Sequence, residues 1–208
     1  MRSVVKVSKT VDEAVKEALR ELDVDQDDVK VEVMEEPSKG LFGLIGVKDA
    51  KVKVTVVNDP IEIADNFLNR LLPSMNIEAM SVVKREGMSL HVDITNISSS
   101  DMGILIGKRG STLDSIQYLL SLVVNKDREN YIKIVVDIKG YRKKREETLI
   151  RLANKMAEKA KYSKRPIRLE PMNPYERRII HSALQNMEGI TTHSEGDEPY
   201  RRVVIQSK

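Results

Sequence analysis

The stretch Ile104-Leu105-Ile106-Gly107-Lys108-Arg109-Gly110 decides how this chain is interpreted. An apolar helical turn leads into two glycines that enclose two cations, and a second helix follows at once. Glycine lets one backbone approach another without a Cβ in the way. A helix N-terminus offers unpaired N–H groups and the positive end of its dipole. With the charges of Lys108 and Arg109, such a loop suits a sugar-phosphate backbone.

Two glycines three residues apart are weak evidence by themselves, because 10 glycines in 208 residues readily produce this spacing by chance. The alternative is an ordinary helix-to-helix turn with a glycine C-cap and solvated cations, and the loop alone does not decide between the two. A nucleotide-binding P-loop is disfavoured, because it needs Gly-x-x-x-x-Gly-Lys and then Ser or Thr. Here only three residues separate Gly103 from Gly107, and Arg109 follows the lysine.

The elements around the loop give it a context. The helix after it has Ser111 or Thr112 as its expected N-cap. Helical spacing predicts that the buried residues of this helix are Leu113, Ile116, Leu119, Leu120 and Val123. Upstream, the pattern predicts a helix over 61–72 and strands over 77–84 and 90–94, and downstream a strand over 132–138.

This order of helix, strand, strand, helix, Gly-x-x-Gly, helix and strand closely resembles a prokaryotic-type (type II) KH domain. The resemblance implies that Gly107, Lys108, Arg109 and Gly110 bind nucleic acid. KH domains clamp about four nucleotides of single-stranded RNA or DNA against such a loop.

Composition excludes several classes of protein. The chain has no cysteine, which excludes disulfides and thiolate chemistry. Its three histidines show no metal-ligand spacing, and no carboxylate pair or nucleophile arrangement points to an enzyme. We therefore expect no catalysis, no metal and no cofactor. No apolar run approaches the roughly 18 residues of a membrane span, so we expect a cytoplasmic protein that does not insert into a membrane.

The net charge of +3 is unevenly distributed. Residues 1–60 hold 10 basic and 13 acidic residues, and residues 61–137 hold 8 and 10. Residues 138–208 hold 17 and 9, a charge of +8. This asymmetry indicates a polyanionic partner for the last third of the chain. The alternative is a solvated helix face, which is the usual role of a run of charges.

The last third begins with a long predicted helix from Gly140 to Lys161. Its expected apolar positions are Leu149, Leu152, Ala153, Met156 and Ala160. Its first half is loaded with cations, namely Arg142, Lys143, Lys144, Arg145 and Arg151. Cations near a helix N-terminus oppose the dipole, and this local cost fits a role in nucleic-acid binding better than a structural one.

After a short strand over 166–169, Asn173 is the expected N-cap of a further helix, with Glu176 completing a capping box. Arg177 and His181 are four residues apart and share one face of this helix. A guanidinium beside an imidazole makes a compact donor pair for a phosphate. The alternative for His181 is a half-buried histidine satisfied by a backbone carbonyl.

The run from Pro171 to His181 resembles the domain that is named for its Arg-xxx-His pair, and the ending over 198–205 is similar to its closing strand. This resemblance implies a small three-stranded sheet carrying helices, and binding of single-stranded nucleic acid. Besides the pair itself, we expect Arg168, Arg201 and Arg202 to approach the same phosphate.

The first third predicts a strand near Val5, a helix over 11–22 and two more strands over 29–33 and 52–56. Between the last two lies a glycine-spaced segment whose apolar residues are Leu41, Phe42, Leu44 and Ile45. They either fold back onto the sheet or form a docking patch for another protein, and the sequence favours neither interpretation.

The order of the three segments resembles the Jag family, bacterial proteins encoded beside a YidC-type membrane insertase. The resemblance implies an α+β fold of three small domains: an N-terminal β-α-β-β domain over 1–57, a type II KH domain over 58–138 and an Arg-xxx-His domain over 139–208. Many relatives carry a long charged linker after the first domain, whereas only Asn58-Asp59-Pro60 stands here.

We therefore expect a single-stranded RNA-binding protein, an RNA chaperone or post-transcriptional regulator. The family resemblance links it to cell elongation, cell shape and peptidoglycan homeostasis, and to a small KH-only protein or a second copy as partner. Two alternatives stay open. One is an adaptor that docks membrane-associated or cell-wall partners through its first domain, and the other is a single-stranded DNA binder. Aromatic residues make up only 4% of the chain, so broad stacking platforms are not expected.

Overall fold

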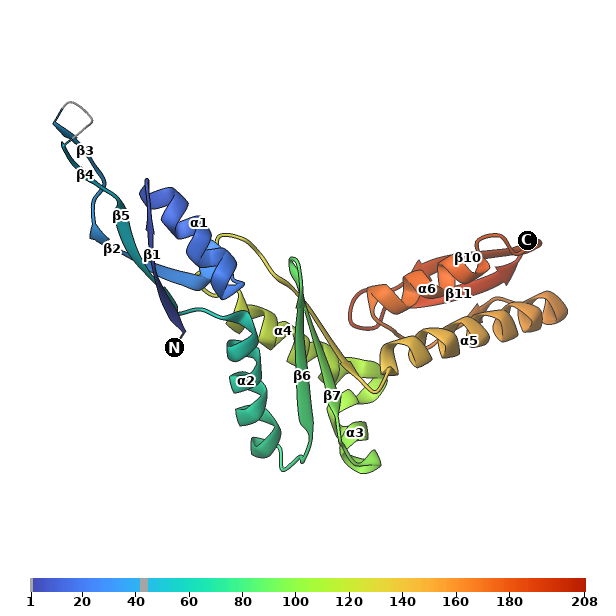
Figure 1. The fold of residues 1–208 in the computed structure, drawn as a ribbon. Coiled ribbons are helices and arrows are strands. Elements are labelled where there is room, and N and C mark those ends of the chain that lie inside the picture. Colours follow the sequence, from blue (N-terminus) through green and yellow to red (C-terminus); the bar gives the residue numbers. More distant parts are fainter. Residues whose placement is uncertain (1, 42–44) are drawn as a thin grey trace. The chain divides into compact units, whose positions relative to one another are not determined.

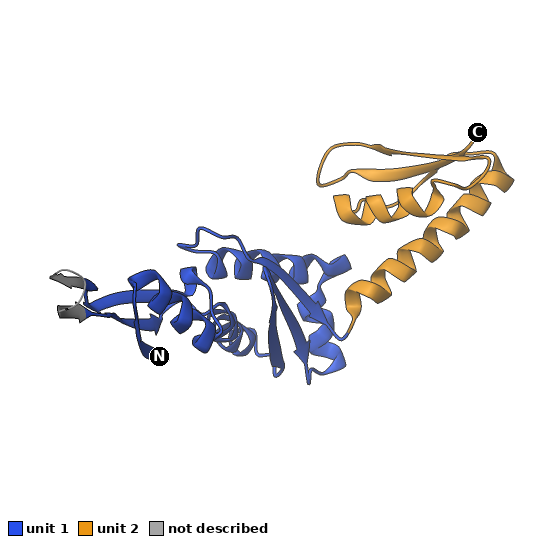
Figure 2. Cartoon of the chain, turned by 45° about the horizontal axis from the view of Figure 1, so that its top comes forward, with its two compact units in different colours: residues 1–139 blue, residues 140–208 orange. Residues whose placement is uncertain are grey.

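The computed structural model describes residues 2–41 and 45–208, and the side chains of residues 39–47 fall outside that description. The chain divides into two compact units, residues 1–139 and 140–208 (Figure 2). Helices and strands are mixed in both units, so the predicted α+β fold is confirmed. The first unit contains both of the first two predicted domains. The boundary expected between residues 57 and 58 therefore falls inside a compact unit and stays a prediction.

The N-terminal part of the first unit is a three-stranded antiparallel sheet covered on one face by a helix (Figure 1). Its elements are β1 (Ser3–Ser8), α1 (Val11–Leu22), β2 (Val29–Glu35) and β5 (Ala50–Val56), in the sheet order β1-β5-β2. Helix α1 begins where the Thr10 hydroxyl accepts the N–H of Glu13 at 3.2 Å. Ala14 and Ala18 pack on β5, and these small residues let the helix lie close to the sheet.

Between β2 and β5 the chain adds a hairpin, β3 (Ser38–Leu41) and β4 (Ile45–Lys48), which the predicted β-α-β-β order lacks. The expected docking residues fall on this hairpin. Phe42 and Leu44 lie outside the described residues, and for Leu41 and Ile45 the structure describes the backbone alone. The docking patch therefore stays a prediction.

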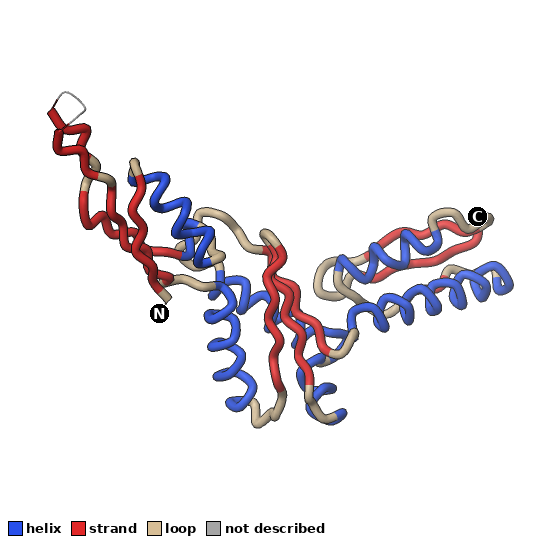
Figure 3. The backbone as a smooth tube through the Cα atoms, viewed as in Figure 1, coloured by secondary structure: helices blue, strands red, loops and turns tan. Residues whose placement is uncertain are grey.

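The rest of the first unit has the expected order of KH elements. They are α2 (Pro60–Ser74), β6 (Met80–Glu86), β7 (Ser89–Thr95), α3 (Ser99–Ile106), α4 (Ser111–Val124) and β8 (Lys133–Ile138). Central strand β7 pairs antiparallel with β6 and parallel with β8, while α2 contacts β6 and α4 contacts β8 (Figure 3). Strand β6 begins at Met80 rather than at Ile77, which is buried in the connection before it.

The buried face of α4 differs from the expected one. Leu113, Ile116, Leu120 and Val124 are buried. Leu119 and Val123, which were predicted to be buried, are 46% and 40% exposed. The buried residues recur at steps of three, four and four, which is a narrow stripe. The apolar pattern on α4 is wider than the face that its neighbours cover.

The second unit places two helices on one face of a three-stranded antiparallel sheet. Its elements are α5 (Tyr141–Ser163), β9 (Ile167–Arg168), α6 (Pro174–Leu184), β10 (Ile190–Glu195) and β11 (Arg202–Ser207), in the sheet order β10-β11-β9. Leu149, Ile180 and Ile205 share one core. Ala157 joins it, whereas Leu152, predicted to be buried, is 37% exposed.

Helix α6 begins as predicted at Asn173, whose side-chain oxygen accepts the N–H of Glu176 at 2.8 Å. The Glu176 carboxylate is directed to α5, where it accepts a hydrogen bond from Arg145 Nε at 2.7 Å. Glu176 is only 4% exposed, so this ion pair joins the two helices from inside the unit.

Candidate nucleic-acid interface

The loop between α3 and α4 has a backbone that its glycines make possible. Gly107 has φ +70° and Gly110 has φ +86°, both in the region that L side chains rarely adopt. A Cβ on Gly107 would lie 2.1 Å from Thr112 Oγ1, so no side chain fits there without displacing the start of α4. Gly110, not Ser111 or Thr112, is the N-cap of α4, because the left-handed turn at Gly110 brings Ser111 directly into the helix.

The two cations of this loop differ in exposure. Lys108 is exposed, whereas Arg109 is half-buried and has φ +58°. The loop therefore presents a mobile ammonium beside a more restrained guanidinium, next to the N-terminus of α4. These features, a positive dipole end, a tight backbone and two cations, are what anion recognition uses.

A cavity of about 590 Å³ in the second unit lies between α6 and the edge strand β10. Its lining includes the predicted pair Arg177 and His181, together with Arg178 and Lys208. Arg178 and Lys208 were not among the residues singled out in the sequence. The only signals available for them were the position of Arg178 beside Arg177 and the terminal position of Lys208. The structure thus gathers three cations and an imidazole around one opening.

Arg177 and His181 are both engaged within the unit. The Arg177 guanidinium is paired with Glu198, and its Nε donates to the Met172 carbonyl at 3.3 Å. His181 Nδ1 lies 2.7 Å from Thr192 Oγ1. His181 Nε2 lies 2.9 Å from Ser194 Oγ.

The partners of His181 are thus hydroxyls of β10 rather than the backbone carbonyl considered above. Burial lowers the pKa of His181 below its ordinary value, and the nearby Arg177 and His193 lower it further. The ring is therefore neutral at pH 7. It holds α6 to β10 while one edge faces the cavity.

The remaining predicted cations do not all join this pair. Ile167, Val203 and Ile205 pack toward the helices, and side chains alternate along a strand. Arg168 and Arg202 therefore lie on the opposite face of the sheet, where Arg168 Nε pairs with Glu195 at 2.9 Å. Arg201 donates to the Gly196 carbonyl at 2.9 Å. The structure does not bring Arg168 and Arg202 to the phosphate expected at Arg177.

A buried ionic network joins the N-terminal sheet to the KH elements of the first unit. Asp28, at the start of β2, is fully buried. Its carboxylate accepts from Arg85 Nη1 at 2.8 Å, from Arg128 Nη1 at 2.7 Å and from the Asp25 N–H at 2.8 Å. Arg128 also donates to the carbonyls of Asn58 and Val124. The short linker is therefore part of this contact.

Burial by itself raises the pKa of Asp28. The Asp25 N–H and the guanidinium groups of Arg85 and Arg128 outweigh burial and hold this pKa below its ordinary value. The carboxylate is thus charged at neutral pH, and each of these three partners donates to it.

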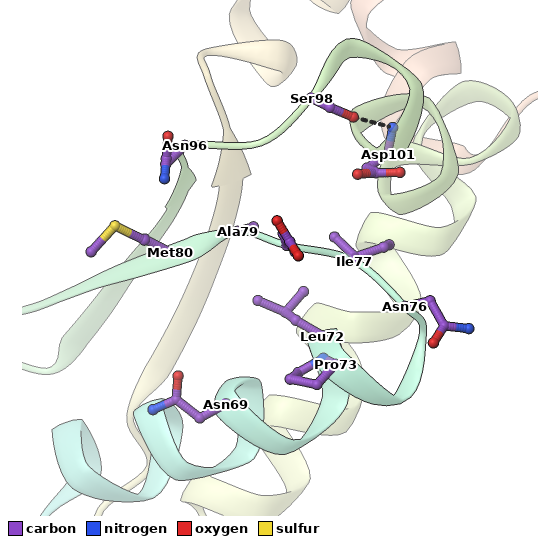
Figure 4. Close-up of a pocket in the computed structure, with 11 residues that line it drawn as sticks. Asn69, Leu72, Pro73, Asn76, Ile77, Ala79, Met80, Asn96, Ser98 and Asp101 are labelled. Atoms are coloured by element: carbon purple, nitrogen blue, oxygen red, sulfur yellow. Dashed lines mark hydrogen bonds between the residues drawn. The ribbon is translucent and has the colours of Figure 1, made fainter.

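A second cavity of about 850 Å³ lies between the end of α2 and the segments that precede β6 and α3 (Figure 4). Its polar groups are mainly the amides of Asn69, Asn76 and Asn96 and the carboxylates of Glu78 and Asp101. None of its lining residues is Lys, Arg or His. This cavity does not fit a phosphate, which leaves the loop and the α6–β10 cavity as the candidate sites.

Within residues 2–41 and 45–208, no helix combines the length and the apolar character that crossing a membrane requires.

Comparisons with known proteins agree with this geometry. Residues 7–56 match the model described as the Jag N-terminus, residues 62–138 the KhpA/KhpB KH domain, and residues 147–207 the domain named for its Arg-xxx-His pair. The chain is 45% identical over 208 residues to RNA-binding protein KhpB of Clostridium symbiosum, covering all of this chain and 93% of that protein. It is 37% identical over 210 residues to RNA-binding protein KhpB of Bacillus subtilis, covering both chains completely. A KhpB of Streptococcus pneumoniae is 27% identical, and the match covers 93% of this chain but 57% of that longer protein. With identities of 45% and 37% over its full length, this chain belongs to the KhpB (Jag) family.

Proposed function

We propose that this chain binds single-stranded RNA, with the Gly107–Gly110 loop as the main contact of its KH elements. The observation that carries the proposal is the loop itself: a backbone only glycine allows, two cations and a helix start within four residues. KH domains hold about four nucleotides against such a loop. The relatives named RNA-binding protein KhpB support RNA as the ligand.

The second contact is the α6–β10 cavity. Arg178 and Lys208 are exposed at its rim and can meet a phosphate directly. Arg177 can do so only by exchanging Glu198 for a phosphate oxygen, a swap of one anion for another. His181 contributes mainly by fixing the cavity wall. The cation set at this site is therefore Arg177, Arg178 and Lys208.

In the cell, this binding serves an RNA chaperone or post-transcriptional regulator that works in the cytoplasm without catalysing a reaction. Cell elongation and peptidoglycan homeostasis are the processes in which family resemblance places it. Both units present cations to a flexible strand, which suits a protein that acts on RNA by holding it rather than by chemistry.

Charge reversal at the loop tests the proposal. Replacing Lys108 and Arg109 by Asp should weaken binding of a short labelled single-stranded RNA by about 1–3 kcal/mol, as expected for lost charge-assisted phosphate contacts. The measurement is fluorescence anisotropy on the full chain. The matched control is Lys9→Asp with Lys126→Asp, which changes the net charge equally at exposed positions outside the loop. Equal affinities of the two double variants, both folded by circular dichroism, would remove the loop from the interface.

A second function, protein docking, is favoured by the outer face of α4. Tyr118 and Leu122 are 63% and 53% exposed there, beside the exposed Leu119 and Val123. A contiguous apolar patch of this kind marks an interaction site. Its partner is a small KH-only protein or a second copy of this chain. In sedimentation velocity, Leu122→Glu should abolish any concentration-dependent association without changing RNA affinity.

The predicted hairpin patch at residues 41–45 would serve a different, membrane-associated partner, as the adaptor alternative requires. Single-stranded DNA is the other alternative ligand, and the same anisotropy assay with DNA of the same sequence separates it from RNA.

A further inference from the structure

Helix α5 has a buried side and an outer side. Over its 23 residues it is about 35 Å long at 1.5 Å per residue. Leu149, Ala153, Ala157 and Ala160 are buried against α6 and the sheet and define one side of the helix. The predominance of alanine keeps the helix close to its neighbours. The opposite side faces solvent along the whole length.

That outer side carries a line of cations. At about 100° per residue, Lys144, Arg151, Lys155 and Tyr162 all fall within about 30° of the direction opposite to the buried side. Lys159 lies about 60° from this direction. All five are exposed. We call this set, Lys144, Arg151, Lys155, Lys159 and Tyr162, the α5 stripe, and it extends over about 27 Å of helix.

The charges of the α5 stripe are largely uncompensated. Throughout the described chain, no carboxylate lies within 4.0 Å of the ammonium groups of Lys144, Lys155 or Lys159. Arg151 donates to the Thr148 hydroxyl at 3.2 Å, which leaves its charge unpaired. Of the flanking acids, Glu158 pairs with Lys161 at 3.8 Å, on the other side of the stripe.

Such a row of like charges is unfavourable for the helix itself. Like charges four residues apart, as at Arg151, Lys155 and Lys159, destabilise an isolated helix by about 0.2–0.5 kcal/mol per pair. Lys144 lies in the first turn of α5, where a cation also opposes the dipole. Folding gains nothing from this arrangement, and a polyanion relieves both costs.

Tyr162 closes the α5 stripe at its C-terminal end. Its side chain is 94% exposed, more than that of any other described tyrosine. An aromatic ring left in water beside a row of cations is a stacking surface, and stacking of a base on such a ring is worth about 1–3 kcal/mol. An acidic protein would satisfy the cations, but it gives no reason for a bare ring at the end of their line.

From these observations we infer that the α5 stripe is a further single-stranded RNA contact, separate from the loop and from the α6–β10 cavity. The cations follow the phosphates along the helix, and Tyr162 stacks one base. The inference rests on the proposed RNA binding. It adds a third surface, on the opposite side of α5 from the core that supports the Arg177–His181 helix.

Neutralising the stripe gives the first test. Lys144→Gln, Arg151→Gln and Lys155→Gln together keep residues of good helix propensity. Each lost phosphate contact should lower the slope of log K against log salt by about 0.7, so the triple variant should lose about 2 units of slope. At 0.15 M salt this corresponds to roughly 50-fold weaker binding. The control is Lys9→Gln, Lys16→Gln and Lys30→Gln, which removes the same charge from the N-terminal part.

Tyr162 allows a second, direct readout. The chain contains no tryptophan, so Tyr162→Trp introduces a single reporter, and RNA should quench its emission. Tyr175→Trp, at a ring that is 62% exposed and off the stripe, is the matched reporter and should respond less.

The outcomes separate the two proposals. Tight binding by the unchanged chain, with affinity and salt slope of the stripe variant equal to those of the control, would overturn the stripe and leave the RNA-binding function intact. It would assign the cations to an acidic protein partner. Failure of the unchanged chain to bind RNA would overturn both.

Discussion

Removing the charge of Asp28 tests how firmly the N-terminal sheet is joined to the KH elements. Asp28→Asn keeps the shape of the side chain but leaves Arg128, whose side chain is 1% exposed, without a counter-charge. Removing one partner of a buried ion pair costs about 3–5 kcal/mol. Arg85 is 18% exposed and keeps Asp25 as a partner, so we expect the lower end, about 3 kcal/mol. That is a large share of the roughly 5–15 kcal/mol that stabilises a typical domain.

The assay is urea unfolding of the full chain by circular dichroism, with hydrogen exchange to assign the loss. Amides of β2, β5 and β7 should exchange faster in the variant, while those of α5 and α6 serve as an internal reference. The control is Glu32→Gln, because the Lys30–Glu32 pair is more than half exposed on both sides and such pairs contribute little. A loss for Asp28→Asn no larger than for Glu32→Gln would refute the reasoning.

The pH dependence of the first unit follows from the same group. Because the folded pKa of Asp28 is lowered, its contribution is present above the unfolded value of about 3.9 and is lost as the pH falls through the lower folded value. Acid unfolding of the unchanged chain should therefore be steeper below about pH 4 than that of Asp28→Asn. Parallel acid transitions would contradict the lowered pKa.

Three further substitutions have defined outcomes. Gly107→Ala should cost at least the 1–3 kcal/mol typical of a strained backbone, because its Cβ meets the start of α4, while Gly103→Ala, with open space around it, should be neutral or stabilising by urea unfolding. The lowered pKa of His181 means that the second unit loses stability as the pH falls below about 6.5, and His181→Gln should flatten thermal unfolding temperatures between pH 7 and 5; an unchanged slope would show that the ring titrates freely. Glu176→Gln should weaken the bond from Arg145 and lower the unfolding temperature of the second unit by an amount equivalent to about 1–3 kcal/mol, and no shift would mean that the pair contributes nothing net.

Local patterns predicted the elements of this fold well because those elements are coded locally. Thr10 and Asn173 are the caps that their spacing to Glu13 and Glu176 predicts. Where the expectation was wrong, the deciding factor was a neighbour that the local pattern does not contain. Leu119 has helical spacing to other apolar residues, but no packed element covers it.

The site was predictable in part. The Gly107–Gly110 loop is contiguous in sequence, so its residues necessarily come together. Arg168 and Arg202 could not be placed from sequence, because their side of the sheet depends on the strand register. The Asp28 network was missed because its members are 57 and 100 residues apart, and each one alone looks like an ordinary surface charge.

The Asp28 network also determines where this chain can be divided. A cut near residue 57, where the sequence pattern changes, would leave an unpaired carboxylate on one fragment and an unpaired guanidinium on the other. A cut at residue 139 crosses no such contact among those of Asp28, Arg85 and Arg128. In genetic recombination, the first two sequence modules would thus be inherited as a pair. A transplanted KH segment would need compensating changes at Arg85 and Arg128 before it could fold well alone.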